Sequence, residues 1–566
     1  MTTERQPSDL DALADEWAET LLDLDPEWHV ELGRPGREGD YGDLSPDGHA
    51  ARREATAAML ARVDAAEPAD AVDQVTKLEL QRVLGIAVEQ HDAGFWRHDL
   101  NVIASPAQNV RDIFDLMPTA SAADWAHVAT RLGNVRAAVD GYVESLRAGI
   151  EAGDTPAIRQ VVEVADQVER QAEPDGFFAA LALRGGDAGL PASLVADLEG
   201  GAESARAAYS VLARFLRDDL APHARERDAV GRDVYALASR GFVGAEIDLD
   251  ETYEWGVEEL ARMVAEQEAI ARQIVPGGTV ADAVAHLDAD PSRMLQGTDA
   301  LQAWMQETSD EAIDHLAGVH FDVPEPMRRL ECMIAPTQLG GIYYTPPSED
   351  FARAGRMWWS VPEGVTEFGT WRERTTVYHE GVPGHHLQCG YAVWNRGELN
   401  AWRRSMNWNS GHGEGWALYA ERLMADLGFL DDPADRLGML DGQRMRAARV
   451  VLDIGVHLEK PMPAALAGVP GRGRRDEQST WTGDAAFGFM AQHVNMNAPF
   501  VRFEVNRYLG WAGQAPSYKV GQRLWEQLRD DARAAAGDAW DPRDFHRQAL
   551  AVGSVSLGTL RDVVLG

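Results

Sequence analysis

The sequence predicts a mainly α-helical protein with one small β-hairpin. Long stretches of the chain place apolar residues at helical spacing, and few segments before residue 330 alternate with the period of a strand. At 566 residues the chain exceeds the size at which one hydrophobic core usually stops growing. Because it contains no internal repeat and no long low-complexity linker, we expect one large helical domain of two lobes around a cleft, residues 9–566, after a flexible tail at 1–8.

Helix signals begin close to the N-terminus. The stretch from Leu10 to Leu24 has apolar residues at helical spacing, and Asp9 is placed to cap its first turn. A loop rich in glycine, proline and aspartate follows at 33–48. Further amphipathic helices are predicted at 50–66, 71–90, 122–152, 158–171, 202–220 and 249–274.

Residues 333–361 differ from this helical pattern. They contain two short β-rich runs, Ile342 to Thr345 and Met357 to Val361, separated by proline- and glycine-containing turns. We therefore expect a hairpin here. An exposed strand can pair with the backbone of a peptide, which would make Tyr344 a substrate contact. The alternative is a structural clip whose aromatic side chains cover the core.

Composition excludes several classes of function. The net charge of -38 disfavours binding to nucleic acid or anionic lipid. No apolar run reaches the roughly 18 residues of a membrane span, and the polar start MTTERQPSDL lacks a secretory signal. Two cysteines, Cys332 and Cys389, cannot form a disulfide framework. We expect a cytoplasmic protein without nucleic-acid or membrane partners; its oligomeric state is left open.

The motif HEGVPGHHLQ at 379–388 carries the strongest functional signal. Zinc peptidases use His-Glu-x-x-His because residues four apart share a helical face. Here the residue four places after His379 is Pro383, not histidine. Histidines occur two and three residues after it, at His385 and His386. On a regular helix His386 would lie about 10.5 Å along the axis from His379, and His385 would point about 120° away.

The motif can therefore hold a metal only if its helix is broken. Pro383 removes a backbone donor, and Gly384 tolerates unusual dihedral angles. We expect the two extra residues to loop out and to return His385 to the position of the second ligand beside His379. His386 is the alternative ligand, and otherwise faces substrate.

A third ligand is needed to leave one coordination position open. The best candidate is Glu414 in SGHGEGWALYAERL, where glycines precede a helix-favouring run; the metal-site segment is thus 374–425. The alternative role for Glu414 is to satisfy free donors at a helix N-terminus. His412 is expected to orient a ligand or bind substrate, and Glu421 to be a surface residue in a salt bridge.

Catalysis would also need a base and a group that stabilises the oxyanion. Glu380, next to His379, is the expected general base toward water. Arg449, Asp453 and His457 repeat every four residues and therefore share one helical face. Such a row of charged residues can serve catalysis. The alternatives are a solvent-exposed helix face and a buried ion pair.

A later segment, RYLGWAGQAPSYKVGQ, offers further candidates. Tyr508 and Tyr518 are suited to an oxyanion, and Arg507 to a terminal carboxylate. Arg449 is a second candidate for binding substrate.

Four segments in order resemble a bacterial family, domain of unknown function 885: HEGVPGHHLQ, EGWALYAE, the R-x-x-x-D-x-G-x-H pattern ending at His457, and RYLGWAGQAPSYKVGQ. The resemblance covers essentially the whole chain. Members are similar in fold to the helical gluzincin metallopeptidases, such as carboxypeptidase Taq, thimet-type oligopeptidases and angiotensin-converting enzyme. The resemblance therefore implies a helical body split by a deep cleft, with the helix that carries the metal ligands at the floor of the cleft.

The resemblance also implies roles for single residues. His379, His385 and Glu414 would bind one zinc ion, with Glu380 as base, and His457, Tyr508 and Tyr518 would contact the substrate or the transition state. The expected function is a zinc-dependent metallopeptidase that hydrolyses short peptides. The alternatives are a catalytically inactive peptide-binding or scaffold protein, and a metal hydrolase of other amides or esters.

Overall fold

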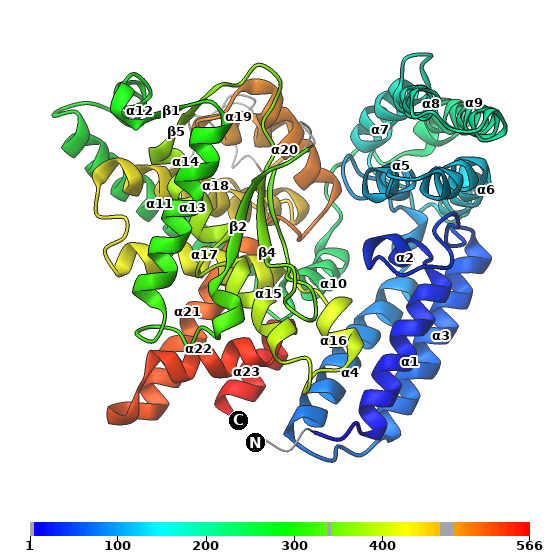
Figure 1. Cartoon of the computed structure of the whole chain (residues 1–566). Coiled ribbons are helices and arrows are strands. Elements are labelled where there is room, and N and C mark those ends of the chain that lie inside the picture. Colours follow the sequence, from blue (N-terminus) through cyan, green and yellow to red (C-terminus); the bar gives the residue numbers. More distant parts are fainter. Residues whose placement is uncertain (1–4, 337–340, 464–479) are drawn as a thin grey trace.

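The structure, a computed structural model, describes residues 5–336, 341–463 and 480–566 and is mainly α-helical (Figure 1). The predicted fold class is therefore confirmed. Helices α1 to α9 lie on one side of the molecule, and the helices from α11 onward lie on the other with the strands (Figure 1).

The N-terminal side is built from helices joined by short loops. Its elements are α1 (Asp9–Leu24), α2 (Glu27–Glu31), α3 (Pro46–Ala65), α4 (Ala71–Asp92), η1 (Phe95–Arg97), α5 (Pro106–Leu116), α6 (Ala122–Ala152), α7 (Ile158–Ala172), α8 (Phe177–Asp187), α9 (Ala192–Arg214), the π-helix η2 (Phe215–Leu220) and η3 (Ala221–His223). Buried side chains of α5 to α9 form a core of their own.

The C-terminal side carries a larger core and the candidate site. Its helices are α10 (Arg232–Val243), α11 (Leu249–Ile274), α12 (Val280–Asp288), η4 (Pro291–Arg293), α13 (Thr298–Leu316), η5 (Glu325–Arg328), α14 (Thr370–Glu380), α15 (His385–Trp394), α16 (Ala401–Ser405), α17 (Ser410–Asp426), α18 (Pro433–His457), α19 (Gly483–His493), α20 (Ala498–Gly510), α21 (Ser517–Ala536), η7 (Gly537–Ala539), α22 (Pro542–Ala551) and α23 (Leu557–Leu565). Helix α11 packs along α18, and α17 along α21.

Most predicted helices of the first half are confirmed, α6 and α11 with their expected ends. The cap of α1 is a correction: Ser8, not Asp9, accepts from the backbone N–H of Asp11. Helix α9 begins ten residues before the predicted start at 202. Its early turns are helical because Leu198 and Gly201 are buried against α6, which sequence spacing alone does not reveal.

The predicted hairpin is present within a larger sheet. Strands β3 (Ile342–Thr345) and β4 (Gly355–Trp359) pair antiparallel, as expected. Strand β2 (Leu330–Ile334), which was not predicted, pairs parallel with β4, so the order is β2-β4-β3 and β3 lies at an edge. Residues 337–340 of the predicted segment lie outside the described residues.

A second element that was not predicted is a small ribbon in which β1 (Met294–Gln296) pairs with β5 (Glu367–Gly369). It leads directly into α14. At the N-terminus, residues 1–4 lie outside the described residues, but the guanidinium of Arg5 already pairs with Asp11 and Asp73. Among the described helices, none is long and apolar enough to cross a membrane.

Candidate metal centre

The HEGVPGHHLQ motif contains a helix break. Helix α14 ends at Glu380 and α15 begins at His385. A Cβ atom at Gly384 would overlap the carbonyl oxygen of His379, so only glycine fits there. The indole N–H of Trp416 donates to the carbonyl oxygens of Pro383 and Gly384, each at 3.0 Å. With this break, which was predicted from Pro383 and Gly384, the ring centroids of His379 and His385 lie 5.1 Å apart.

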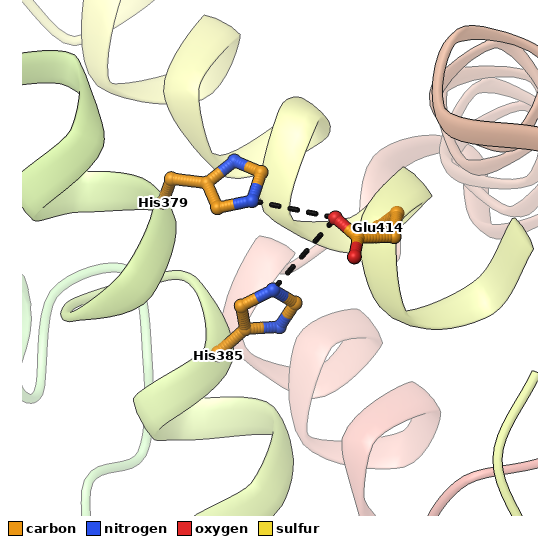
Figure 2. A group of neighbouring side chains, drawn as sticks. All are labelled: His379, His385 and Glu414. Atoms are coloured by element: carbon orange, nitrogen blue, oxygen red, sulfur yellow. Dashed lines mark ion pairs between the residues drawn. The ribbon is translucent and has the colours of Figure 1, made fainter. Parts of the chain in front are cut away.

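Glu414 reaches this pair from the first turns of α17. The glycines around it permit close packing: a side chain at Gly411 would meet the backbone of Val243, and one at Gly415 would meet that of Gly521 on α21. The glycine-rich sequence therefore sets the approach of α17 to its neighbours. As a result, the carboxylate of Glu414 points between the two imidazoles (Figure 2).

The three side chains fit one zinc ion. Oε2 of Glu414 lies 3.4 Å from Nε2 of His379 and 3.9 Å from Nε2 of His385 (Figure 2). Two ligand atoms of a tetrahedral zinc are about 3.4 Å apart when each lies about 2.05 Å from the metal. All three candidate ligand atoms lie within 4.8 Å of one another. The set of two imidazoles and one carboxylate is also a ligand set of catalytic zinc.

The opposite ring nitrogens have fixed partners. Nδ1 of His379 donates to Oε1 of Glu421 at 2.7 Å, and Glu421 also accepts from the hydroxyl of Thr375 at 2.8 Å. Nδ1 of His385 lies 3.2 Å from Oε1 of Gln388. Such outer contacts fix the tautomer and the orientation of metal-binding histidines. They leave the Nε2 atoms facing Glu414.

Glu421 is a correction to the sequence analysis, which placed it on the surface. Its side chain is buried, because α17 turns it toward α14. It lies seven residues, about two helical turns, after Glu414 and so shares that residue's face. This spacing was the available signal.

Burial and neighbouring charges shift several pKa values at the site. Burial raises the pKa of Glu380 to about 8. Burial lowers the pKa of His385 to about 4, which favours its neutral form. For His379, burial opposes protonation, but the carboxylates of Glu414 and Glu421 outweigh it and raise the pKa to about 10. Arg446 on α18, which the sequence analysis missed, adds positive charge near Glu380 and Glu414, and its buried Nε has no hydrogen-bond partner.

His386 and Tyr344 bind each other and not the cluster. Nε2 of His386 donates to the carbonyl oxygen of Met327 at 2.7 Å, and Nδ1 accepts from the hydroxyl of Tyr344 at 2.9 Å. Both ring nitrogens are therefore occupied, and His385 takes the position that the sequence left open between the two. The pair ties β3 to α15. Tyr344 also lines the pocket beside the cluster.

His412 and His457 lie in the core, in contrast to the substrate contacts expected from the sequence. Both rings are fully buried. Nδ1 of His412 donates to the carbonyl oxygen of Val555 at 2.7 Å, and Nε2 of His457 to that of Tyr508 at 3.0 Å. Each histidine is thus held by a backbone carbonyl from a distant part of the chain.

Arg449 forms the buried ion pair that the sequence analysis gave as an alternative to a catalytic role. Its guanidinium donates to Glu504 at 2.8 Å and to the hydroxyl of Tyr508 at 2.7 Å. Arg507 donates to the same carboxylate at 3.3 Å and to Gln514. These partners occupy both arginines and Tyr508.

Tyr518 lies closer to the cluster. Burial, and then the nearby carboxylate of Glu414, raise its pKa. Its ring also lies 5.1 Å from the guanidinium carbon of Arg449. Of the three late candidates, Tyr518 is therefore the one whose charge environment includes a candidate ligand.

A pocket of about 670 Å³ adjoins the cluster. Glu380, His385 and Glu414 line it together with the edge strand β3 and Trp408. Its volume lies in the range of roughly 300–1,000 Å³ that holds small-molecule ligands. We call it the metal-site pocket.

Fold and site together define a helical protein with a candidate metal centre of two histidines and a glutamate. The family model described as bacterial protein of unknown function (DUF885) matches residues 26–564. The chain belongs to this family.

Two solved structures share the fold. One, described as a "putative lipoprotein" from Colwellia psychrerythraea, aligns with a TM-score of 0.82 at 21% identity and covers 98% of each chain. The other, a "putative lipoprotein of unknown function" from Shewanella oneidensis, has a TM-score of 0.74 at 16% identity and covers 99% of this chain and 100% of its own. The comparison with curated proteins gave no match.

Proposed function

We propose that the protein is a zinc-dependent metallopeptidase that hydrolyses short peptides. The observation that carries the proposal is the convergence of His379, His385 and Glu414 beside a pocket that His385, Glu414 and Glu380 line. The sequence motifs, which resemble those of a family expected to share the gluzincin fold, point to the same reaction.

Each residue has a role that its surroundings allow. His379, His385 and Glu414 would hold the zinc ion, which supplies a Lewis acid that activates water and polarises the substrate carbonyl. Glu380, whose pKa burial raises, accepts a proton from the attacking water and returns it to the leaving amine. We assign stabilisation of the developing oxyanion to Tyr518, whose pKa is raised by burial and by the nearby carboxylate of Glu414.

The pocket favours peptides as substrates. Its wall includes Ile342 to Tyr344 of β3, which is an edge strand. Unpaired backbone groups of an edge strand can bind an extended peptide. Orientation by β3 would place a peptide bond across the cluster.

The test is peptide cleavage by the zinc-loaded full-length protein. A mixture of synthetic peptides of two to ten residues is incubated and analysed by mass spectrometry, with Glu380→Gln as the inactive variant and the exposed Glu398→Gln as its control. We expect cleavage by the wild type and by the control, and at least a hundredfold loss in Glu380→Gln. Failure to cleave any peptide overturns the proposal, and an ester panel then tests hydrolysis of other acyl compounds.

A further inference from the structure

Trp408 is an exposed aromatic residue beside the candidate ligands. Its side chain is 53% exposed, and its ring centroid lies 6.0 Å from that of His385. Indole atoms Cζ2 and Cη2 occupy the space that a side chain at Gly413 would need. The absence of a side chain at Gly413 thus lets the indole lie against the first turn of α17, one residue before Glu414.

Two pockets meet at this indole. The metal-site pocket lies on one side. On the other side is a second pocket of about 850 Å³, lined by α4, α10 and α23. The two have Asn407 and Trp408 in common. Trp408 therefore stands between the cluster and a larger hollow.

The two shared residues differ in how they are held. The side-chain amide of Asn407 donates to Glu79 at 3.0 Å and to the carbonyl oxygen of Ser554 at 2.9 Å, so it is a fixed part of the wall. Trp408 is half exposed, and its ring packs against Gly413 and lies beside His385. Of the two, only the indole can be removed without breaking a buried hydrogen-bond network.

We infer that Trp408 closes the metal-site pocket and limits the length of the peptide that binds across the cluster. The inference rests on the proposed function. A peptide aligned along β3 would lie in the pocket that Glu380 and His385 line, and the indole forms part of the wall of that pocket. Removal of the indole joins the two pockets, so that additional residues of a longer peptide can enter the second one.

The experiment measures binding separately from cleavage. Zinc-loaded Glu380→Gln protein, with and without Trp408→Ala, is titrated by calorimetry with N-acetylated peptides of two to eight residues built from one repeated sequence. We expect affinity with Trp408 present to stop rising at a short length. In Trp408→Ala it should continue to rise, with at least fivefold tighter binding of the longest peptides.

Controls separate a local effect from a general one. Trp394→Ala removes another exposed tryptophan, 44% exposed, which does not line the metal-site pocket; its length profile should match that of the parent. Trp408→Leu serves if Trp408→Ala lowers the zinc content. Equal length profiles with and without Trp408, in a protein that binds peptides, overturn this inference alone. Absence of binding by every variant overturns both the inference and the proposed function.

Discussion

Oε1 of Glu421 lies 2.7 Å from Nδ1 of His379, and this buried contact decides which nitrogen of the imidazole faces the cluster. A carboxylate accepts only, so in the neutral ring that metal binding requires, Nδ1 carries the single proton. Nε2 is then free as an electron-pair donor, 3.4 Å from Glu414. The candidate centre therefore includes a residue that binds no metal itself.

Replacement of Glu421 should weaken zinc binding without removing a ligand. Loss of such an outer partner typically lowers metal affinity by about 10- to 100-fold, and we expect this for Glu421→Ala. Competition with a coloured chelator measures it. The exposed Glu398→Gln should retain the wild-type affinity. An unchanged affinity in Glu421→Ala would show that His379 does not depend on this contact.

The helix break should tolerate no side chain at Gly384. In Gly384→Ala, the added methyl overlaps the carbonyl oxygen of His379, and overpacking of this kind costs about 1–3 kcal/mol of unfolding free energy. We expect a lower thermal midpoint and weaker zinc binding. Gly397→Ala is the matched control, because a Cβ there meets nothing within 4 Å. Similar behaviour of the two variants would refute the steric account.

Arg449 should matter for stability more than for metal binding. In Arg449→Met, the buried carboxylate of Glu504 keeps one ion-pair partner, Arg507 at 3.3 Å, and the hydroxyl of Tyr508. Loss of one partner of a buried ion pair costs about 3 kcal/mol. Denaturant titration should show this loss, while the folded variant binds zinc normally. Arg227→Met, which breaks an exposed pair with Glu459, should change stability by less than about 0.5 kcal/mol. Loss of zinc from folded Arg449→Met would contradict this prediction.

Glu259 should make stability depend on acidic pH. Burial opposes its ionisation, but Arg262 and Lys519 lower its pKa to about 2. A carboxyl group whose pKa is depressed in the folded state stabilises the protein above its unfolded pKa, and that contribution is lost as pH falls toward the folded pKa. The difference in unfolding free energy between wild type and Glu259→Gln should therefore shrink between pH 5 and pH 3. A difference that stays constant across this range would falsify the assignment.

The sequence predicts those parts of the fold and site that depend on local spacing. The ends of α6 and α11 follow from apolar periodicity and capping. The break between His379 and His385 follows from helix geometry together with Pro383 and Gly384. The candidacy of Glu414 as third ligand follows from the glycines that precede it at the start of a helix-favouring run.

The remainder depends on contacts between distant segments. Strand β2 is recognised only through its pairing with β4, and Glu421 is buried only because α17 packs against α14. His457 carries a motif position but lies in the core formed with Tyr508. Trp408 has no distinctive local pattern, and its place beside His385 appears only in the folded chain.

The most direct test of the central claim is the zinc content of the purified full-length protein after zinc loading and dialysis, measured by mass spectrometry of the metal. We expect near-stoichiometric zinc in the wild type and strongly reduced zinc in His379→Ala, His385→Ala and Glu414→Ala, each shown to be folded by circular dichroism. His386→Ala should keep its zinc, because both of its ring nitrogens already have partners in the protein. A wild-type protein without zinc, or variants that retain it fully, would contradict the account.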